Sequence, residues 1–146
     1  MNSILLIHGP NLNLLGEREP EIYGRSTLED YVDRVRSHAN QVGLTVEAIQ
    51  SNSDGDIVDA IHRARREHRA IIINAGALTH YAWSLHDALA AFSGPVVEVH
   101  ISQPNAREPW RHTSVVAPAA SGSIAGFGIL GYELAVSAVA SLLGKV

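Results

Sequence analysis

The 146-residue chain contains no cysteine, and only one of its eleven basic residues, Lys145, is a lysine. The absence of cysteine excludes disulfide bonds, thiolate catalysis and thiolate metal sites. Lys145 is the penultimate residue, and chain ends are usually poorly ordered. We therefore do not expect a mechanism that needs a buried Schiff-base lysine or the lysine of a phosphate-binding loop.

The sequence also lacks a long apolar run and a strong excess of either charge. No apolar run approaches the ~20 residues that span a bilayer, and no basic segment followed by an apolar run marks a signal peptide. The formal net charge of −4 gives no electrostatic reason to bind nucleic acid or an anionic membrane. We expect a cytoplasmic protein with neither partner. The length fits a single domain, residues 1–146, with a core of ordinary size.

Apolar runs alternate with segments of helical periodicity along the chain. Strands are predicted over residues 4–7, 44–49, 70–73, 96–99 and 114–117, with helices starting near residues 26 and 53 and helices over 82–92 and 132–143. Because every crossover between the first four strands contains a helix, the pattern predicts an α/β fold with a five-stranded parallel sheet between two helical layers. In the flavodoxin-like strand order 2-1-3-4-5, a ligand binds at the carboxyl ends of the strands, where the order reverses.

Short polar segments mark where two of these helices begin. Ser26-Thr27-Leu28-Glu29 is typical of a capping box, in which we expect Ser26 to accept a hydrogen bond at the helix start and Glu29 to reach back. The segment Ser53-Asp54-Gly55-Asp56 starts the next helix.

Polar side chains follow the first, third and fourth strands, which are neighbours in that strand order. The set comprises Asn11, Arg18, Tyr23, Asn74, His80, Glu98, His100, Ser102, Arg107 and Arg111. Taken singly, an asparagine or histidine after a strand is more often a turn former or a structural hydrogen-bonding residue. Their joint placement at one rim of the sheet indicates a binding site. Glu98 would be costly to bury without a partner, and His100 or an arginine of the next loop is the candidate.

At these residues the chain resembles the type II 3-dehydroquinate dehydratases over nearly its whole length. The matching segments are Gly9-Pro10-Asn11-Leu12-Asn13-Leu14-Leu15-Gly16, Arg18-Glu19-Pro20, Tyr23-Gly24, Asn74-Ala75-Gly76, Thr79-His80, Glu98-Val99-His100-Ile101-Ser102, Arg107-Glu108, Arg111, Ser114 and Gly126-Phe127-Gly128. Any one of these motifs is weak alone, but together they occur in the family's order and spacing. Gln103 and Trp110 depart from the family's usual Asn and Phe, and neither is a residue that the family uses for chemistry.

The resemblance implies a hydro-lyase that converts 3-dehydroquinate to 3-dehydroshikimate in the shikimate pathway, through an enolate and without Schiff base, metal or cofactor. It implies that Tyr23 is the base, Arg18 the cation that activates it, His100 the general acid, and Asn11 the holder of a water that stabilises the enolate. Tyrosine is almost fully protonated at pH 7, and an adjacent cation favours its phenolate. Glu98 points to the same face of the strand as His100, and we interpret it as the group that orients this histidine and keeps it protonated.

The resemblance also implies which residues bind the anionic, hydroxyl-bearing substrate: Asn74, His80, Ile101 and Ser102 with their backbone amides, Arg107 and Arg111. Arg107 could add to the field at Tyr23. Asp87 lies on a predicted helix, and its family counterpart reaches the site of a neighbouring subunit. The resemblance therefore implies a homo-oligomer, a dodecamer built from trimers.

Two alternatives remain open from the residues themselves. A flavodoxin-like module could bind a flavin or nucleotide between Trp83 and Trp110, although the segment after the first strand offers no hydroxyl- and glycine-rich phosphate cradle. The same dehydration could also serve the breakdown of quinate rather than aromatic amino acid biosynthesis.

Overall fold

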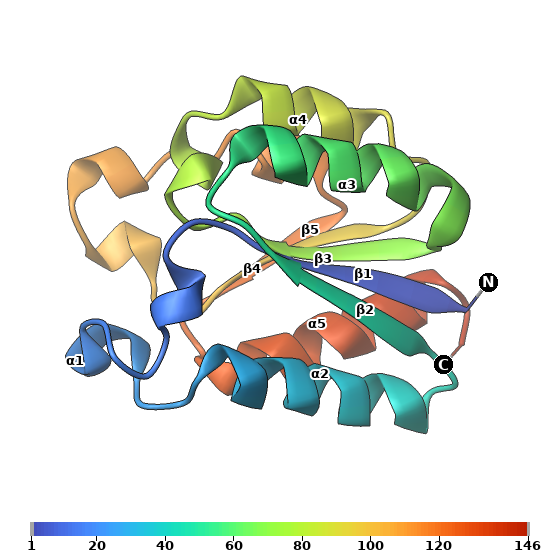
Figure 1. The fold of residues 1–146 in the computed structure, drawn as a ribbon, viewed down its shortest axis with the longest axis horizontal. Helices are drawn as coiled ribbons and strands as arrows, with labels where there is room; N and C mark the ends of the chain where they lie inside the picture. Colours follow the sequence, from blue (N-terminus) through green and yellow to red (C-terminus); the bar gives the residue numbers. More distant parts are fainter. Residues whose placement is uncertain (1, 146) are drawn as a thin grey trace.

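The computed structural model describes residues 2–145. The five strands are β1 (Ser3–His8), β2 (Thr45–Gln50), β3 (Ala70–Asn74), β4 (Val96–His100) and β5 (Gly122–Ala125). The five helices are α1 (Pro20–Tyr23), α2 (Leu28–Gln41), α3 (Asp54–Glu67), α4 (Trp83–Ala90) and α5 (Ile129–Leu142). All strand pairs are parallel and the sheet order is β2-β1-β3-β4-β5. The flavodoxin-like three-layer prediction is therefore confirmed (Figure 1). No helix within residues 2–145 is both long and apolar enough to cross a membrane.

Two hydrophobic cores lie on the two faces of the sheet. Helices α2 and α5 cover one face, and α3 and α4 cover the other (Figure 1). Successive side chains of a strand point to opposite faces. Ile4 and Leu6 accordingly pack in the first core, whereas Leu5 and Ile7 pack in the second. The unbroken apolar run of β1 thus reflects a strand that is covered on both sides.

The predicted fifth strand, residues 114–117, is wrong. This segment is irregular and runs into a 3-10 turn at Ala117–Ala119, while the fifth strand is Gly122–Ala125 at the sheet edge beside β4. Val115 and Val116 are buried because the segment lies over the second face, with the Val115 N–H bonded to the Thr79 carbonyl. The segment is apolar because it is buried outside the sheet, and its apolar residues therefore resembled those of a strand.

The predicted capping box is displaced by one residue. Thr27, not Ser26, is the N-cap of α2, because its hydroxyl accepts from the Asp30 N–H while the Asp30 carboxylate accepts from the Thr27 N–H. Ser26 stands three residues before Glu29, and Thr27 stands three residues before Asp30. The sequence alone therefore did not decide between the two capping boxes. The predicted start of α3 is confirmed, and the Ser53 hydroxyl caps the helix by accepting from the Asp56 N–H.

The loops after β1 and β3 approach each other closely at the carboxyl end of the sheet. The Gly9 N–H donates to the Asn74 carbonyl, and a Cβ at Gly9 would lie 2.3 Å from the Ala75 carbonyl oxygen. Asn11 then adopts a left-handed conformation with φ 69°, which asparagine tolerates better than most residues. The loop after β1 is folded rather than extended, with a 3-10 turn at Leu12–Leu14 and the short helix α1. This arrangement places the polar rim predicted from the sequence around one hollow.

Candidate active site

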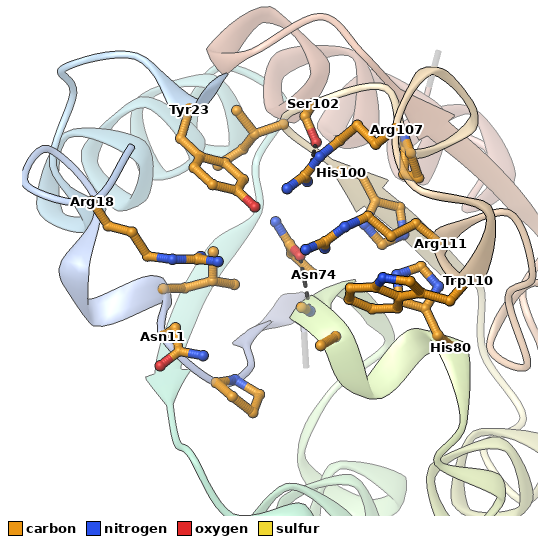
Figure 2. Close-up of a pocket in the computed structure, with 16 residues that line it drawn as sticks. Asn11, Arg18, Tyr23, Asn74, His80, His100, Ser102, Arg107, Trp110 and Arg111 are labelled. Carbon is orange, nitrogen blue, oxygen red and sulfur yellow. Dashed lines mark hydrogen bonds between the residues drawn. The ribbon is translucent and has the colours of Figure 1, made fainter. Parts of the chain in front are cut away.

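A pocket of about 270 Å³ opens at the carboxyl ends of β1, β3 and β4. Ten of the predicted site residues line it: Asn11, Arg18, Tyr23, Asn74, His80, His100, Ile101, Ser102, Arg107 and Arg111. In Figure 2, the residues that follow β1 stand on one side and those that follow β4 on the other, with Asn74 of β3 between them. This is the position at which parallel sheets bind ligands, where the strand order reverses.

Tyr23 stands between two guanidinium groups. The Cζ of Arg18 lies 4.9 Å from the centroid of the Tyr23 ring, and the Cζ of Arg107 lies 5.3 Å from it. The Tyr23 hydroxyl points into the pocket (Figure 2). Helix α1 holds this tyrosine, because Pro20 starts the helix and the Tyr23 N–H donates to the Glu19 carbonyl. Two cations thus face one phenol at the edge of the pocket.

Glu98 is a buried residue of β4, and both of its carboxylate oxygens accept hydrogen bonds. It accepts hydrogen bonds from the hydroxyls of Thr79, Ser114 and Ser123, and His100 Nε2 lies 2.7 Å from its Oε2. Burial alone raises the pKa of such a carboxyl group. The hydrogen bond and positive charge of His100, with the Thr79 and Ser114 hydroxyls, outweigh burial and lower the pKa of Glu98 below its ordinary value.

The carboxylate fixes the orientation of His100. Because Nε2 faces Glu98, Nδ1 is the ring nitrogen left for a molecule in the pocket. His100 therefore turns its Nδ1 side toward the pocket, with Glu98 behind it.

The opposite wall combines aromatic rings and a cation. The His80 Nδ1 lies 2.7 Å from the Thr113 carbonyl, and its ring meets Trp110 edge-on at 5.4 Å between centroids. The Arg111 guanidinium lies 4.0 Å from the centroid of the Trp110 ring. Burial, as the largest cause, lowers the pKa of His80, so that this histidine is neutral at pH 7. The wall offers a cation and a neutral imidazole to a bound anion.

The loop after β4 supplies further donors. The Arg107 Nη1 donates to the Ser102 hydroxyl at 3.0 Å, while its buried Nε has no hydrogen-bond partner among residues 2–145. Ile101 is buried beside Ser102 in the pocket wall. Together with Arg18 and Arg111, Arg107 places three guanidinium groups around one small cavity, which is suited to an anionic ligand.

Two predicted site residues do not line the pocket. Glu98 lies behind His100 and reaches the pocket only through it. Asp87 is exposed on α4, outside the cavity. The sequence interpretation named Trp110 only as a flank for a flavin ring and as a departure from the family pattern, whereas the structure places it in the pocket wall. The interpretation missed Ser123 beside Glu98, because the strand that carries it was placed elsewhere.

Among the described residues, the only cluster of metal-ligating side chains is formed by Glu47, Glu67 and His68. None of them lines the pocket. Both ring nitrogens of His68 already have hydrogen-bond partners, Glu47 and Ser3. The cluster therefore forms a structural contact between α3 and the strands β1 and β2.

Comparisons with known proteins agree on one family. The profile described as "Dehydroquinase class II" matches residues 2–140. The chain is 54% identical over 138 residues to 3-dehydroquinate dehydratase 1 of Corynebacterium efficiens, covering 94% of this chain and 91% of the relative. It is 50% identical over 139 residues to the 3-dehydroquinate dehydratase of Halalkalibacterium halodurans, covering 95% and 96%.

A solved structure gives the same result. The type II dehydroquinase from Propionibacterium acnes superposes with a TM-score of 0.92 at 42% identity, covering 97% of both chains. The resemblance read from the motifs is thereby confirmed, and the chain belongs to the class II dehydroquinase family.

Proposed function

We propose that this chain removes water from 3-dehydroquinate to give 3-dehydroshikimate, as a step of the shikimate pathway. Family membership supports the reaction, since relatives about half identical over nearly full length bear the name 3-dehydroquinate dehydratase. The observation that carries the proposal is the pairing, in one pocket, of a phenol between two guanidiniums with a histidine backed by a carboxylate. These pairs correspond to the base and the acid that a dehydration needs.

Tyr23 is assigned the role of base. It takes the proton from the carbon beside the ketone, and the electron pair moves into an enolate. The guanidiniums of Arg18 and Arg107 support this role because they stabilise the phenolate that must form first. Asn11, on the rim of the same pocket, is assigned to hold a water that stabilises the enolate oxygen.

His100 is assigned the role of general acid. The enolate expels the ring hydroxyl, and His100 gives it the proton that converts it to water. Glu98 acts through His100, by holding the ring with its Nε2 toward the carboxylate.

The remaining polar residues are assigned to substrate binding. Ile101 and Ser102 bind the substrate carboxylate through their backbone amides and the Ser102 hydroxyl. Asn74, His80 and Arg111 bind the carboxylate and ring hydroxyls. These groups lie within the same cavity and include a positive charge suited to an anion.

The protein is further proposed to act in the cytoplasm as a homo-oligomer, a dodecamer built from trimers. Asp87 supports assembly because it is exposed on α4 and cannot serve the pocket of its own chain. Tyr81 and Trp83, beside the start of the same helix, are 64% and 61% exposed, and exposed aromatic groups often mark interfaces. A neighbouring subunit would cover them and would receive Asp87 in its own site.

The flavin- or nucleotide-binding module is not favoured. After β1 the chain forms a 3-10 turn at Leu12–Leu14, whereas a phosphate-binding loop leads into the N-terminus of a long helix. The family match points to the dehydratase instead.

Turnover of 3-dehydroquinate tests the proposal. The product is a conjugated enone, so its ultraviolet absorbance should rise when catalytic amounts of the purified protein are added. A colourless preparation that produces this signal supports the dehydratase. A yellow preparation without turnover would support the flavin-binding alternative and reject the proposal.

A further inference from the structure

A line of three buried polar side chains runs beneath the pocket. His8 ends β1, and its Nε2 lies 3.0 Å from the hydroxyl of Tyr132 on α5. The Asn74 Nδ2 at the end of β3 donates to the same hydroxyl at 3.1 Å. His8 and Tyr132 are fully buried, and only Asn74 reaches the pocket wall. The sequence interpretation gave no role to His8 or Tyr132.

The environment fixes where the protons of this line lie. Burial lowers the pKa of His8 to about 3 and raises the pKa of Tyr132, so that both side chains are neutral at pH 7. The Tyr132 oxygen accepts from Asn74 and can donate its single proton only to His8 Nε2. His8 then carries its own proton on Nδ1, the one atom of the line that has no partner among residues 2–145. The opposite tautomer would leave the Tyr132 proton unpaired as well.

Both ends of the Asn74 amide are held in consequence. Its Oδ1 accepts from the Gly76 N–H at 3.1 Å, and its Nδ2 donates to Tyr132. If the amide were flipped, the Asn74 Nδ2 would face the Gly76 N–H, and both groups are hydrogen-bond donors. With one hydrogen bond at each end, the amide keeps one N–H proton and one Oδ1 lone pair for a molecule in the pocket. Asn74 lies at the pocket wall (Figure 2).

We propose that His8 and Tyr132 are positioning residues, which hold the Asn74 amide in the orientation that binds a polar group of the substrate. This inference rests on the proposed function. His8 serves as the acceptor that directs the Tyr132 proton away from Asn74, and Tyr132 then serves as the acceptor for the Asn74 amide. The pocket thereby has a hydrogen-bond donor of fixed orientation that carries no charge.

Tyr132→Phe tests the line with little change in shape. It keeps the ring that stacks on His8 and meets Tyr31 edge-on, but it removes the hydroxyl. We expect KM to rise about tenfold, with a smaller change in kcat, because a held substrate contact is loosened. In an Asn74→Ala background, the same substitution should change KM less than twofold. A folded Tyr132→Phe protein with the KM of the parent would overturn the proposal. So would a double variant in which the separate effects of Tyr132→Phe and Asn74→Ala on KM multiply.

Substitutions at His8 give a second test if Tyr132→Phe does not fold. His8→Gln retains an oxygen that can accept from Tyr132, whereas His8→Leu does not. The glutamine variant should keep KM near the parent value and the leucine variant should raise it. Equal KM values in the two folded variants would contradict the proposal.

Nitrogen NMR of His8 separates this inference from the proposed function. The ring should be neutral at pH 7 with its proton on Nδ1, whether or not the protein turns over 3-dehydroquinate. A proton on Nε2, or a charged ring at pH 7, would overturn the positioning line. Absence of turnover with the expected tautomer would instead reject the proposed function.

Discussion

At the scale of single residues, Glu98 shows how a carboxylate can remain ionised inside a sheet. Three hydroxyls and one imidazole surround it, so its desolvation is compensated by hydrogen bonds and by charge. The same contacts orient His100. A neutral isostere at position 98 would keep much of the shape and lose the charge.

We therefore expect Glu98→Gln to lower kcat by about 100-fold or more, within the range that a general acid contributes, and to change KM by much less. Glu47→Gln, outside the pocket, is the matched control and should leave both constants unchanged. Steady-state kinetics on the two folded variants measures the difference. Unchanged turnover in Glu98→Gln would reject the role assigned to this carboxylate.

Much of the pocket could be predicted at this scale because its side chains follow strand ends. Asn11, Asn74 and His100 are polar residues next to buried strands, so parallel topology alone brings them together. His8 and Tyr132 could not be predicted in the same way. The two residues lie 124 positions apart in sequence, and each one alone is typical of a protein core.

At the scale of elements, the cap of α2 and the edge strand β5 were the points where the sequence misled. The cap of α2 is set by geometry, because only Thr27 accepts from the backbone three residues later. The edge strand β5 begins with Gly122 and Ser123, two small, exposed residues, and therefore shows no apolar alternation. Buried central strands and amphipathic helices, by contrast, were predicted correctly to within a few residues.

Thr27→Ala should lower the free energy of unfolding by about 1 kcal/mol, since it removes the N-cap of α2. Ser26→Ala is the matched control and should change it by less than about 0.5 kcal/mol. Denaturant unfolding of the two variants provides the measurement. Equal losses, or a larger loss at Ser26, would show that the cap observed here does not hold α2 in solution.

At the scale of the whole molecule, the fold follows from its alternating elements, but assembly does not. The strand order arises because crossover helices must cover both faces of the sheet. No pattern within one chain specifies which surfaces meet a second copy. Asp87 on α4 links the fold to the proposed assembly. It lies outside the pocket of its own chain, so it can contribute to a pocket only if another chain is present.

We expect light scattering to give a mass that is a multiple of the trimer, with Asp87→Ala reducing kcat/KM in the assembled protein. Asp59→Ala, an exposed substitution on α3, is the control and should leave kcat/KM unchanged. A monomer with full activity would remove Asp87 from the site and contradict the proposed assembly.

The central claim is that Tyr23, between Arg18 and Arg107, takes the proton from 3-dehydroquinate. The most direct measurement is kcat for the Tyr23→Phe variant, compared with Tyr31→Phe, which alters a buried tyrosine outside the pocket. Because a positioned base contributes about 10²- to 10⁴-fold, Tyr23→Phe should lose at least ~100-fold in kcat while remaining folded, and Tyr31→Phe should match the parent. A folded Tyr23→Phe protein that retains most of its turnover would contradict the account.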